Sequence, residues 1–173
     1  MEKLGAIGRF LQSRNDVAVI EAIGSWPVID AGMPGRTSMD LDVWLPGSQF
    51  DQSALREACL AAEMGFDPIG EADTPYIQLV RPGIVHVPPH TAEYGSTYGS
   101  LTVNVPPAAA LIASKLVRAA AKDIEDSLFL QNKFSISAAD VANCANQITN
   151  PLARETATEN VVYLRISGAT PSA

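Results

Sequence analysis

Two aspartates in the segment RTSMDLDVW are the residues of this sequence best suited to hold a metal ion. Asp40 and Asp42 stand two positions apart in a stretch that alternates polar and apolar residues, as a β-strand does. On such a strand both carboxylates point to one side, about 7 Å apart along the chain. Carboxylates held this close repel each other unless a cation shares them, and Mg²⁺ with phosphate oxygens completing its shell meets that need. The alternative is a solvated strand face with two ordinary acids.

Two short motifs precede the acidic strand. Gly24-Ser25 follows a buried strand and opens a short helix, an arrangement in which backbone N–H groups face an anion. Arg36-Thr37 comes directly before the acids and supplies a guanidinium donor and a hydroxyl beside them. The alternatives are a plain turn for the first motif and a surface ion pair for the second.

A third group of charged residues lies in the alanine-rich segment that starts at Pro107. Read as one helix, the segment brings four of them within an arc of about 80°: Lys115, Arg118, Lys122 and Asp126. This stripe of three cations and one acid suits a face turned toward a triphosphate. The alternative is a solvated face in which a pair at i,i+4, Lys122 with Asp126, contributes only about 0.2–0.5 kcal/mol.

The elements that must position these residues follow from hydrophobic spacing and from turn-forming residues. Strands are expected over 17–23, 37–45, 76–80, 84–87 and 101–105, and a loop over 88–100. Helices are expected over 3–13, 26–31, 51–65, 107–131, 138–148 and 151–165. The pattern predicts an α+β fold, in which a small mixed β-sheet with flanking helices is followed by a C-terminal helical half.

Length and composition limit the classes of fold and function that are possible. The chain has 173 residues, 47% of them hydrophobic, which suits one domain with an ordinary core rather than a disordered chain. We expect a single domain over 1–173, with an α/β core over 1–105 and C-terminal helices over 106–166 packed on it. A net charge of −7 argues against coating nucleic acid, so any RNA contact should be local.

The two cysteines and the lack of long apolar runs bear on location. Cys59 and Cys144 form no CxxC pair, which argues against a disulfide framework or a zinc ribbon. No apolar run approaches the roughly 20 residues that cross a bilayer, and the N-terminus is too polar for a signal peptide. We therefore expect a cytoplasmic protein with reduced thiols and no membrane partner.

Taken in order, these motifs resemble the nucleotidyltransferase superfamily with its DNA polymerase β-like fold. The likeness is to the small bacterial nucleotidyltransferase-like proteins that include abortive-infection and toxin–antitoxin members. That family shows a strand, a Gly-Ser or Gly-Gly turn and a helix, and then an RxTxDhDh segment, where h is apolar. Here the turn is Gly24-Ser25 and the segment carries Arg36, Asp40 and Asp42, with Thr37 one residue off the strict spacing. The family's later lysine-rich helix with a KDxxD element is matched by Lys115, Lys122, Asp123 and Asp126.

The resemblance covers about residues 17–130 and implies roles for the matching residues. Asp40 and Asp42 would hold Mg²⁺ and the phosphates of a nucleoside triphosphate, and Ser25 with its backbone amide would contact the γ-phosphate. Lys115 or Lys122 would steady the developing charge. The implied reaction is nucleotidyl transfer, in which an RNA or protein hydroxyl attacks the α-phosphate and pyrophosphate leaves. A cognate antitoxin or toxin is the implied protein partner.

One departure from the family keeps a second function open. Active members bring a third carboxylate from a later strand, yet YIQLV, IVHV and LTVNV contain no Asp or Glu. Neither His86 nor Glu93 matches the expected position. The alternative is therefore a non-catalytic nucleotidyltransferase-like binding protein, and a third reading is an oligomeric structural protein that kept the fold without the site.

Overall fold

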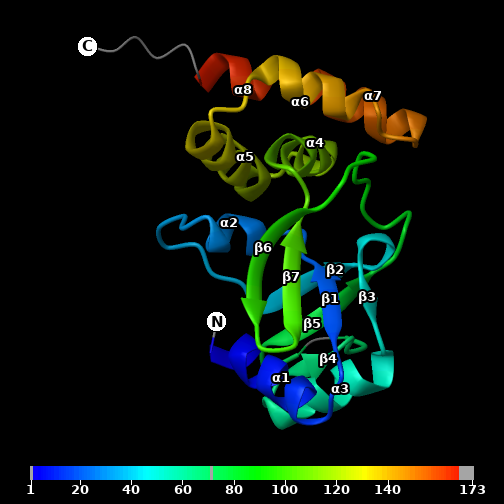
Figure 1. Cartoon of the computed structure of the whole chain (residues 1–173). Coiled ribbons are helices and arrows are strands. Elements are labelled where there is room, and N and C mark those ends of the chain that lie inside the picture. The colour runs from blue at the N-terminus through cyan, green and yellow to red at the C-terminus, as the bar shows by residue number, and fades with distance from the viewer. Residues whose placement is uncertain (1, 71, 168–173) are drawn as a thin grey trace. The chain divides into compact units, whose positions relative to one another are not determined.

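The computed structural model describes residues 2–70 and 72–167 and confirms the α+β class (Figure 1). Its N-terminal elements are α1 (Glu2–Ser13), β1 (Ala18–Glu21), α2 (Trp26–Asp30), β2 (Asp40–Trp44), the 3-10 helix η1 (Leu45–Gly47), β3 (Gln49–Phe50), α3 (Gln52–Ala61) and β4 (Gly65–Phe66). They are followed by β5 (Tyr76–Val80), β6 (Glu93–Tyr98), β7 (Leu101–Val105), α4 (Ala108–Arg118), α5 (Ala121–Phe134), α6 (Ala138–Ala145), α7 (Pro151–Asn160) and α8 (Val162–Ser167). Within the described ranges, no helix is both long enough and apolar enough to cross a bilayer.

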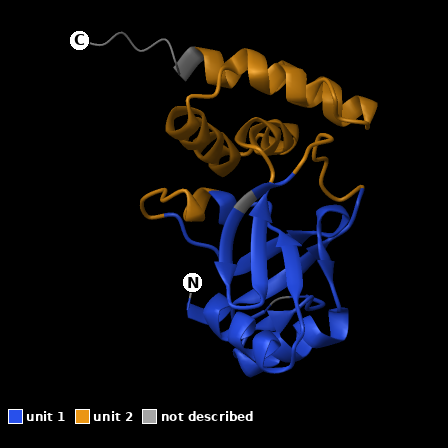
Figure 2. Cartoon of the chain, viewed as in Figure 1, with its two compact units in different colours: residues 1–27, 36–82, 92–105 blue, residues 28–35, 83–91, 106–173 orange. Residues whose placement is uncertain are grey.

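The chain divides into two compact units (Figure 2). Unit 1, drawn in blue, holds the strands and is made of residues 1–27, 36–82 and 92–105. Unit 2, drawn in orange, holds the C-terminal helices and is made of residues 28–35, 83–91 and 106–173. Two short segments of unit 2, residues 28–35 and 83–91, come from within the N-terminal core expected from the sequence.

Unit 1 contains two small sheets that meet where β1 ends. The first has the strand order β3-β1-β7-β6, with β1 and β7 parallel, and the second has the order β2-β5-β4, with parallel neighbours. An isolated antiparallel bridge between Ala22 and Val43 joins them. This bridge brings the turn that follows β1 next to β2, which is the strand that carries the two acids.

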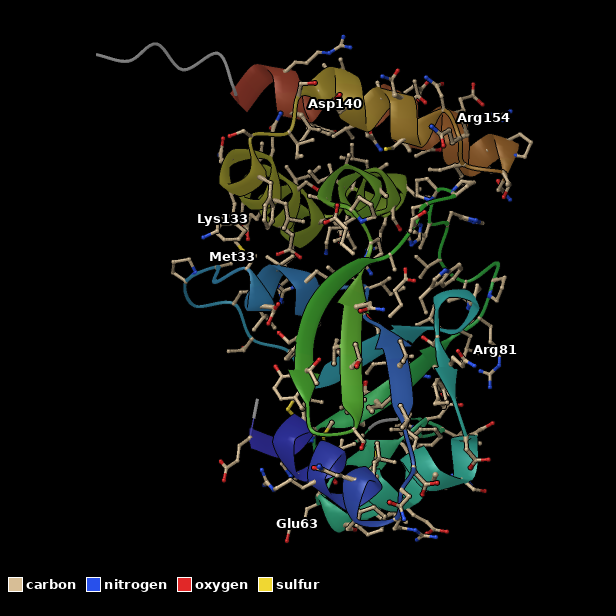
Figure 3. The ribbon with its side chains drawn as sticks, viewed as in Figure 1. Met33, Glu63, Arg81, Lys133, Asp140 and Arg154 are labelled. Carbon is tan, nitrogen blue, oxygen red and sulfur yellow. The ribbon has the colours of Figure 1, made fainter. Side chains whose placement is uncertain are left out.

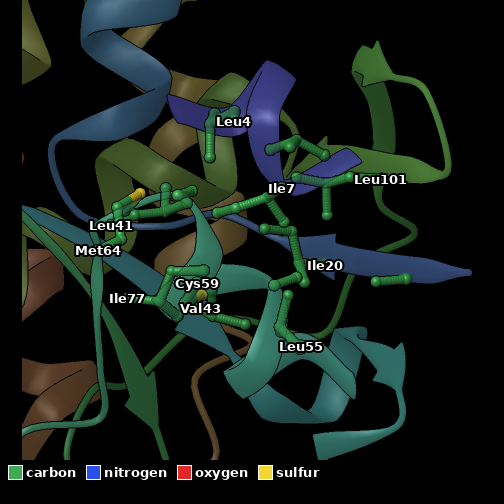
Figure 4. Close-up of a cluster of buried hydrophobic side chains, with 14 of the residues drawn as sticks. Leu4, Ile7, Ile20, Leu41, Val43, Leu55, Cys59, Met64, Ile77 and Leu101 are labelled. Carbon is green, nitrogen blue, oxygen red and sulfur yellow. The ribbon is translucent and has the colours of Figure 1, made fainter. Parts of the chain in front are cut away.

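The core of unit 1 lies between the sheets and helices α1 and α3 (Figure 4). Alternation along each strand sends its apolar residues to this side, and each helix adds an apolar face. The largest buried contributors are Ile7, Leu11, Ile20, Leu41, Val43, Leu55, Ile77 and Leu101. Because Leu41 and Val43 face the core, the residues that alternate with them on β2 face away from it.

Unit 2 is built from helices, with α4 packed against α5, α6 and α7, and α5 packed against α8. The expected single helix over 107–131 is wrong, because it breaks where Ala119 adopts a left-handed backbone with φ +49°. The Asp123 carboxylate accepts the amide of Ala120 at 3.2 Å and so caps a new helix. A run of alanines reads as continuous helix, and only this local hydrogen bond decides otherwise.

Two further expectations are corrected in the segment between β5 and β7. Residues 84–87 form no strand, because Pro82 and Pro88-Pro89 flank them and deprive the backbone of amide donors. The expected loop over 88–100 instead contains β6, which pairs antiparallel with β7. Few apolar residues mark β6 in the sequence, because it forms the edge of its sheet and Gly95 lies at a shift in its register.

Candidate functional site

Asp40 and Asp42 both lie on β2 and are half-buried, while the residues between and after them, Leu41 and Val43, are 4% and 0% exposed. The alternation expected from the sequence is therefore confirmed, and the two carboxylates share one face of the strand. The hydroxyl of Ser38 donates a hydrogen bond to Oδ1 of Asp40. The strand thus presents an acidic pair on a rigid element whose other face is fixed in the core.

The Gly24-Ser25 turn lies directly against the second acid. The amide of Ile23 donates to the carbonyl oxygen of Asp42 at 2.9 Å, which ties the end of β1 to β2. Gly24 has φ +68°, and a Cβ added there would overlap Oδ2 of Asp42. Glycine is needed for both reasons, because the backbone is left-handed and the carboxylate fills the space of a side chain. The expected short helix follows as α2, which has five residues.

Arg36 connects this turn to the segment that leads into β2. Its Nη2 donates to Oγ of Ser25 at 3.0 Å, and its Nη1 donates to the carbonyl oxygen of Thr37 at 2.9 Å. The side chain of Thr37 is exposed. Unit 1 therefore brings Gly24, Ser25, Arg36 and Asp42 together from two nearby segments of the chain, in which Ser25 and Arg36 are 11 positions apart.

Strand β5 adds polar residues beside the acids that sequence reasoning missed. The parallel register pairs Asp40 with Tyr76 and Asp42 with Gln78, so all four side chains lie on the same face. Partial burial, followed by the negative charges of Asp40 and Asp42, raises the pKa of the Tyr76 phenol above its ordinary value. The alternation in YIQLV could have indicated this face, but nothing local reveals which residues of β2 stand beside it.

A third acid lies one strand further along the same sheet. Asp67, which follows β4, accepts hydrogen bonds from Nε2 of Gln78 at 2.7 Å and from the amide of Leu79 at 3.1 Å. Arg81, labelled in Figure 3, donates to the other carboxylate oxygen of Asp67 at 3.3 Å. These bonds fix Asp67 to β5 and to Arg81, so Gln78 stands between this acid and Asp42.

The donor set of β2 suits a magnesium ion that a phosphate ligand also coordinates. Two carboxylates on one strand face match the one or two that Mg²⁺ takes when phosphates complete its shell. Across residues 2–70 and 72–167 no cluster of three or more His, Cys, Asp or Glu side chains could hold a metal by itself. A magnesium ion bound at these two acids would take only part of its coordination shell from the protein, and the ligand would supply the rest.

The three cations of the expected helical stripe belong to unit 2, where two of them form ion pairs. Lys115 is 8% exposed, and its Nζ lies 2.7 Å from Oδ2 of Asp126. Arg118 holds Asp123 through two hydrogen bonds of 2.6 and 2.7 Å. Lys122 is exposed. The expected single stripe is wrong, because the break at Ala119 places these residues on two helices, and the ammonium found on Asp126 is that of Lys115.

No family model matches the sequence, and searches of curated proteins and of solved structures find no match.

Proposed function

We propose that this protein is a nucleotidyltransferase that moves a nucleoside monophosphate from a nucleoside triphosphate to a hydroxyl of an RNA or a protein, with Mg²⁺ as cofactor. The single observation that carries the proposal is the contact of the Gly24-Ser25 turn with Asp42 on the strand that also bears Asp40. It places the Ser25 hydroxyl and the backbone of a turn beside an acidic pair. Phosphate oxygens accept hydrogen bonds from hydroxyl and amide donors, and the cation that accompanies them is coordinated by carboxylates.

Each residue of the cluster has a role in this proposal. Asp40 and Asp42 hold Mg²⁺, which when bound neutralises charge on the phosphates and on the leaving pyrophosphate. Ser25 donates its hydroxyl to a terminal phosphate oxygen. Arg36 orients Ser25 and adds positive charge beside it, as its 3.0 Å hydrogen bond to Oγ indicates. Phosphoryl transfer depends mostly on positioning and charge neutralisation. These few groups supply both types of interaction.

A second candidate function is nucleotide binding without transfer. It is favoured by the strand beside the acids, where the positions in register with Asp40 and Asp42 carry Tyr76 and Gln78 rather than a carboxylate. A site with only two acids holds a cation and its phosphates but brings no third acid to activate the acceptor hydroxyl. In this case the protein would bind the nucleotide as one partner of a toxin–antitoxin pair.

One experiment tests both functions. The full chain is incubated with each α-³²P-labelled nucleoside triphosphate, Mg²⁺ and either total RNA or a protein extract, and equilibrium binding of the same nucleotides is measured in parallel. Transfer of label that Asp40→Asn and Asp42→Asn abolish supports the transferase. Binding that both substitutions abolish, without any transfer, supports the binding protein.

The matched control is Asp73→Asn, which removes an exposed carboxylate from unit 1 between β4 and β5. It should change neither binding nor transfer. If the wild-type chain neither binds nor transfers any nucleotide in the presence of Mg²⁺, both functions are refuted.

A further inference from the structure

Tyr76 occupies a distinctive place beside the acidic pair. It is the first residue of β5, which lies between β2 and β4, and it pairs in register with Asp40 on one side and with Gly65 on the other. Neighbouring strands are about 4.8 Å apart, so the side chains of Tyr76 and Asp40 are adjacent on one face. Gly65 has no side chain, which leaves that flank of the tyrosine without a neighbour on β4.

The polar groups on this face of β5 are not equally available. The amide of Gln78 is engaged, because its Nε2 donates to Oδ1 of Asp67 at 2.7 Å. The hydroxyl of Tyr76, by contrast, has no hydrogen-bond partner among the residues that the structure describes. Tyr76 is half-buried and stands on the sheet rather than in a loop. The side chain of Tyr76 therefore lies on the same face as the two carboxylates, and its hydroxyl has no hydrogen-bond partner among the described residues.

The chemistry of the site decides which ligand group this donor would meet. A cation on Asp40 and Asp42 is bridged to phosphate oxygens, so the atoms nearest the tyrosine in a loaded site are anionic acceptors. A phenol is a neutral donor, and it binds such an oxygen without needing a counter-charge of its own. Lysine or arginine at this position would carry a positive charge beside Asp40 and compete with the cation, whereas the neutral phenol of tyrosine does not.

We propose that the hydroxyl of Tyr76 hydrogen-bonds a phosphate oxygen of the nucleotide whose cation is held by Asp40 and Asp42. Tyr76 is then a ligand-binding residue for the triphosphate, and the metal ion does not depend on it. This inference rests on the function proposed above, and it adds a phosphate contact on the side of the acids opposite the Gly24-Ser25 turn, because β5 and β1 flank β2 from the two sides.

The test compares two probes on the full chain. Mn²⁺ alone, followed by electron paramagnetic resonance, reports the cation site, and inorganic tripolyphosphate with Mg²⁺, followed by calorimetry, reports phosphate binding. Tyr76→Phe keeps the ring and removes only the hydroxyl. It should weaken tripolyphosphate binding about tenfold, as expected for loss of a hydrogen bond to a charged group, and leave Mn²⁺ binding unchanged, which also shows that the variant is folded.

Tyr98→Phe is the matched control, because it removes a hydroxyl from a half-buried tyrosine of β6 in the same unit. It should bind both probes as the wild type does. If Tyr76→Phe binds tripolyphosphate with wild-type affinity while Asp40→Asn abolishes binding of both probes, the role of Tyr76 is refuted and the cation site stands. If the wild type binds neither probe, the proposed function and this inference both fail.

Discussion

Gly24 and Asp42 together show how a missing side chain makes room for a neighbouring carboxylate. The carboxylate of Asp42 occupies the space in which a Cβ of residue 24 would lie, and the left-handed backbone at φ +68° needs glycine as well. An alanine at position 24 would therefore act in two ways, by straining the turn and by displacing the acid.

We expect Gly24→Ala to weaken Mg²⁺-dependent nucleotide binding at least tenfold, because the added methyl group pushes the Asp42 carboxylate away from its position. Calorimetry with a nucleoside triphosphate and Mg²⁺ measures the change. Gly35→Ala is the matched control, since Gly35 has a similar φ of +70° but nothing within 4 Å of an added Cβ. Equal losses in the two variants would mean that backbone strain, and not the displaced acid, is responsible.

Cys59 is expected to be an unreactive thiol. It is 0% exposed, and burial raises the pKa of this thiol to about 12, so almost none of it is thiolate at pH 8. Burial, followed by the charge of Asp140, also raises the pKa of the half-buried Cys144. Mass spectrometry after iodoacetamide treatment at pH 8 should find Cys59 the slower of the two in the native protein. Alkylation of Cys59 as fast as in urea would contradict its burial.

At the residue scale the sequence predicts the acidic pair well and its neighbours poorly. The placement of Asp40 and Asp42 on one strand face follows from alternation, which is a local property. The association of Arg36 with Ser25 follows from how the chain returns from α2 to β2. The register that places Tyr76 beside Asp40 depends on the pairing of strands more than thirty residues apart, and no local pattern contains it.

At the scale of the helices, Lys115 has a structural role, because it links α4 to α5. The Lys115 ammonium lies 2.7 Å from the Asp126 carboxylate, and their side chains are 8% and 1% exposed. A buried pair of this kind contributes little over an apolar substitute, but removal of one partner leaves the other charge in a poorly solvated place. The pair therefore specifies how the two helices join.

We expect Lys115→Met to lower the free energy of unfolding by about 3–5 kcal/mol, because the buried Asp126 carboxylate loses its ammonium partner. Urea denaturation followed by circular dichroism measures the effect. Lys122→Met is the control, since this exposed lysine at the start of α5 should change stability by less than about 0.5 kcal/mol. A Lys115→Met protein with wild-type stability but impaired nucleotide binding would instead favour a role for Lys115 at the ligand site.

The sequence predicts helices and strands well where the hydrophobic periodicity is strong. It fails where a side-chain hydrogen bond determines the end of an element. Strands 76–80 and 101–105 have the expected bounds, because apolar and polar residues alternate cleanly in both. The break at Ala119 was missed, since alanine favours a helix and the hydrogen bond from Ala120 to Asp123 overrides that preference. The edge strand β6 is not predicted, because its sequence EYGSTY contains few apolar residues.

For the whole molecule, Asp123, whose carboxylate is held by Arg118, should make the free energy of unfolding depend on pH. Burial tends to raise the pKa of Asp123, but the hydrogen bond and charge of Arg118, together with the charge of Lys115, outweigh it and hold the pKa below its usual range. A carboxyl group with a lowered pKa in the folded state contributes stability that is fully present above its unfolded pKa and is lost as the pH falls through its folded pKa.

We therefore expect the free energy of unfolding to decrease as the pH falls below about 4, the pKa of an unperturbed aspartate. Asp123→Asn should reduce this dependence, because it removes the group whose protonation is linked to unfolding. Arg118→Met should also reduce it by returning the Asp123 pKa toward the usual range. Urea denaturation between pH 3 and pH 7 measures the slopes, and parallel curves for the three proteins would contradict the assignment.

The position of β7 has a consequence for how the protein is made. Residues 18–21 of β1 pair with residues 101–104 of β7. The edge of β1 that does not pair with β3 is therefore covered only by a strand about eighty residues further along the sequence. During synthesis on the ribosome, β1 must wait with unpaired amides and carbonyls until residue 104 has emerged. An exposed strand edge recruits other strands, and distant pairing slows folding. Chains that terminate before residue 101 should therefore be the ones that aggregate or require a chaperone.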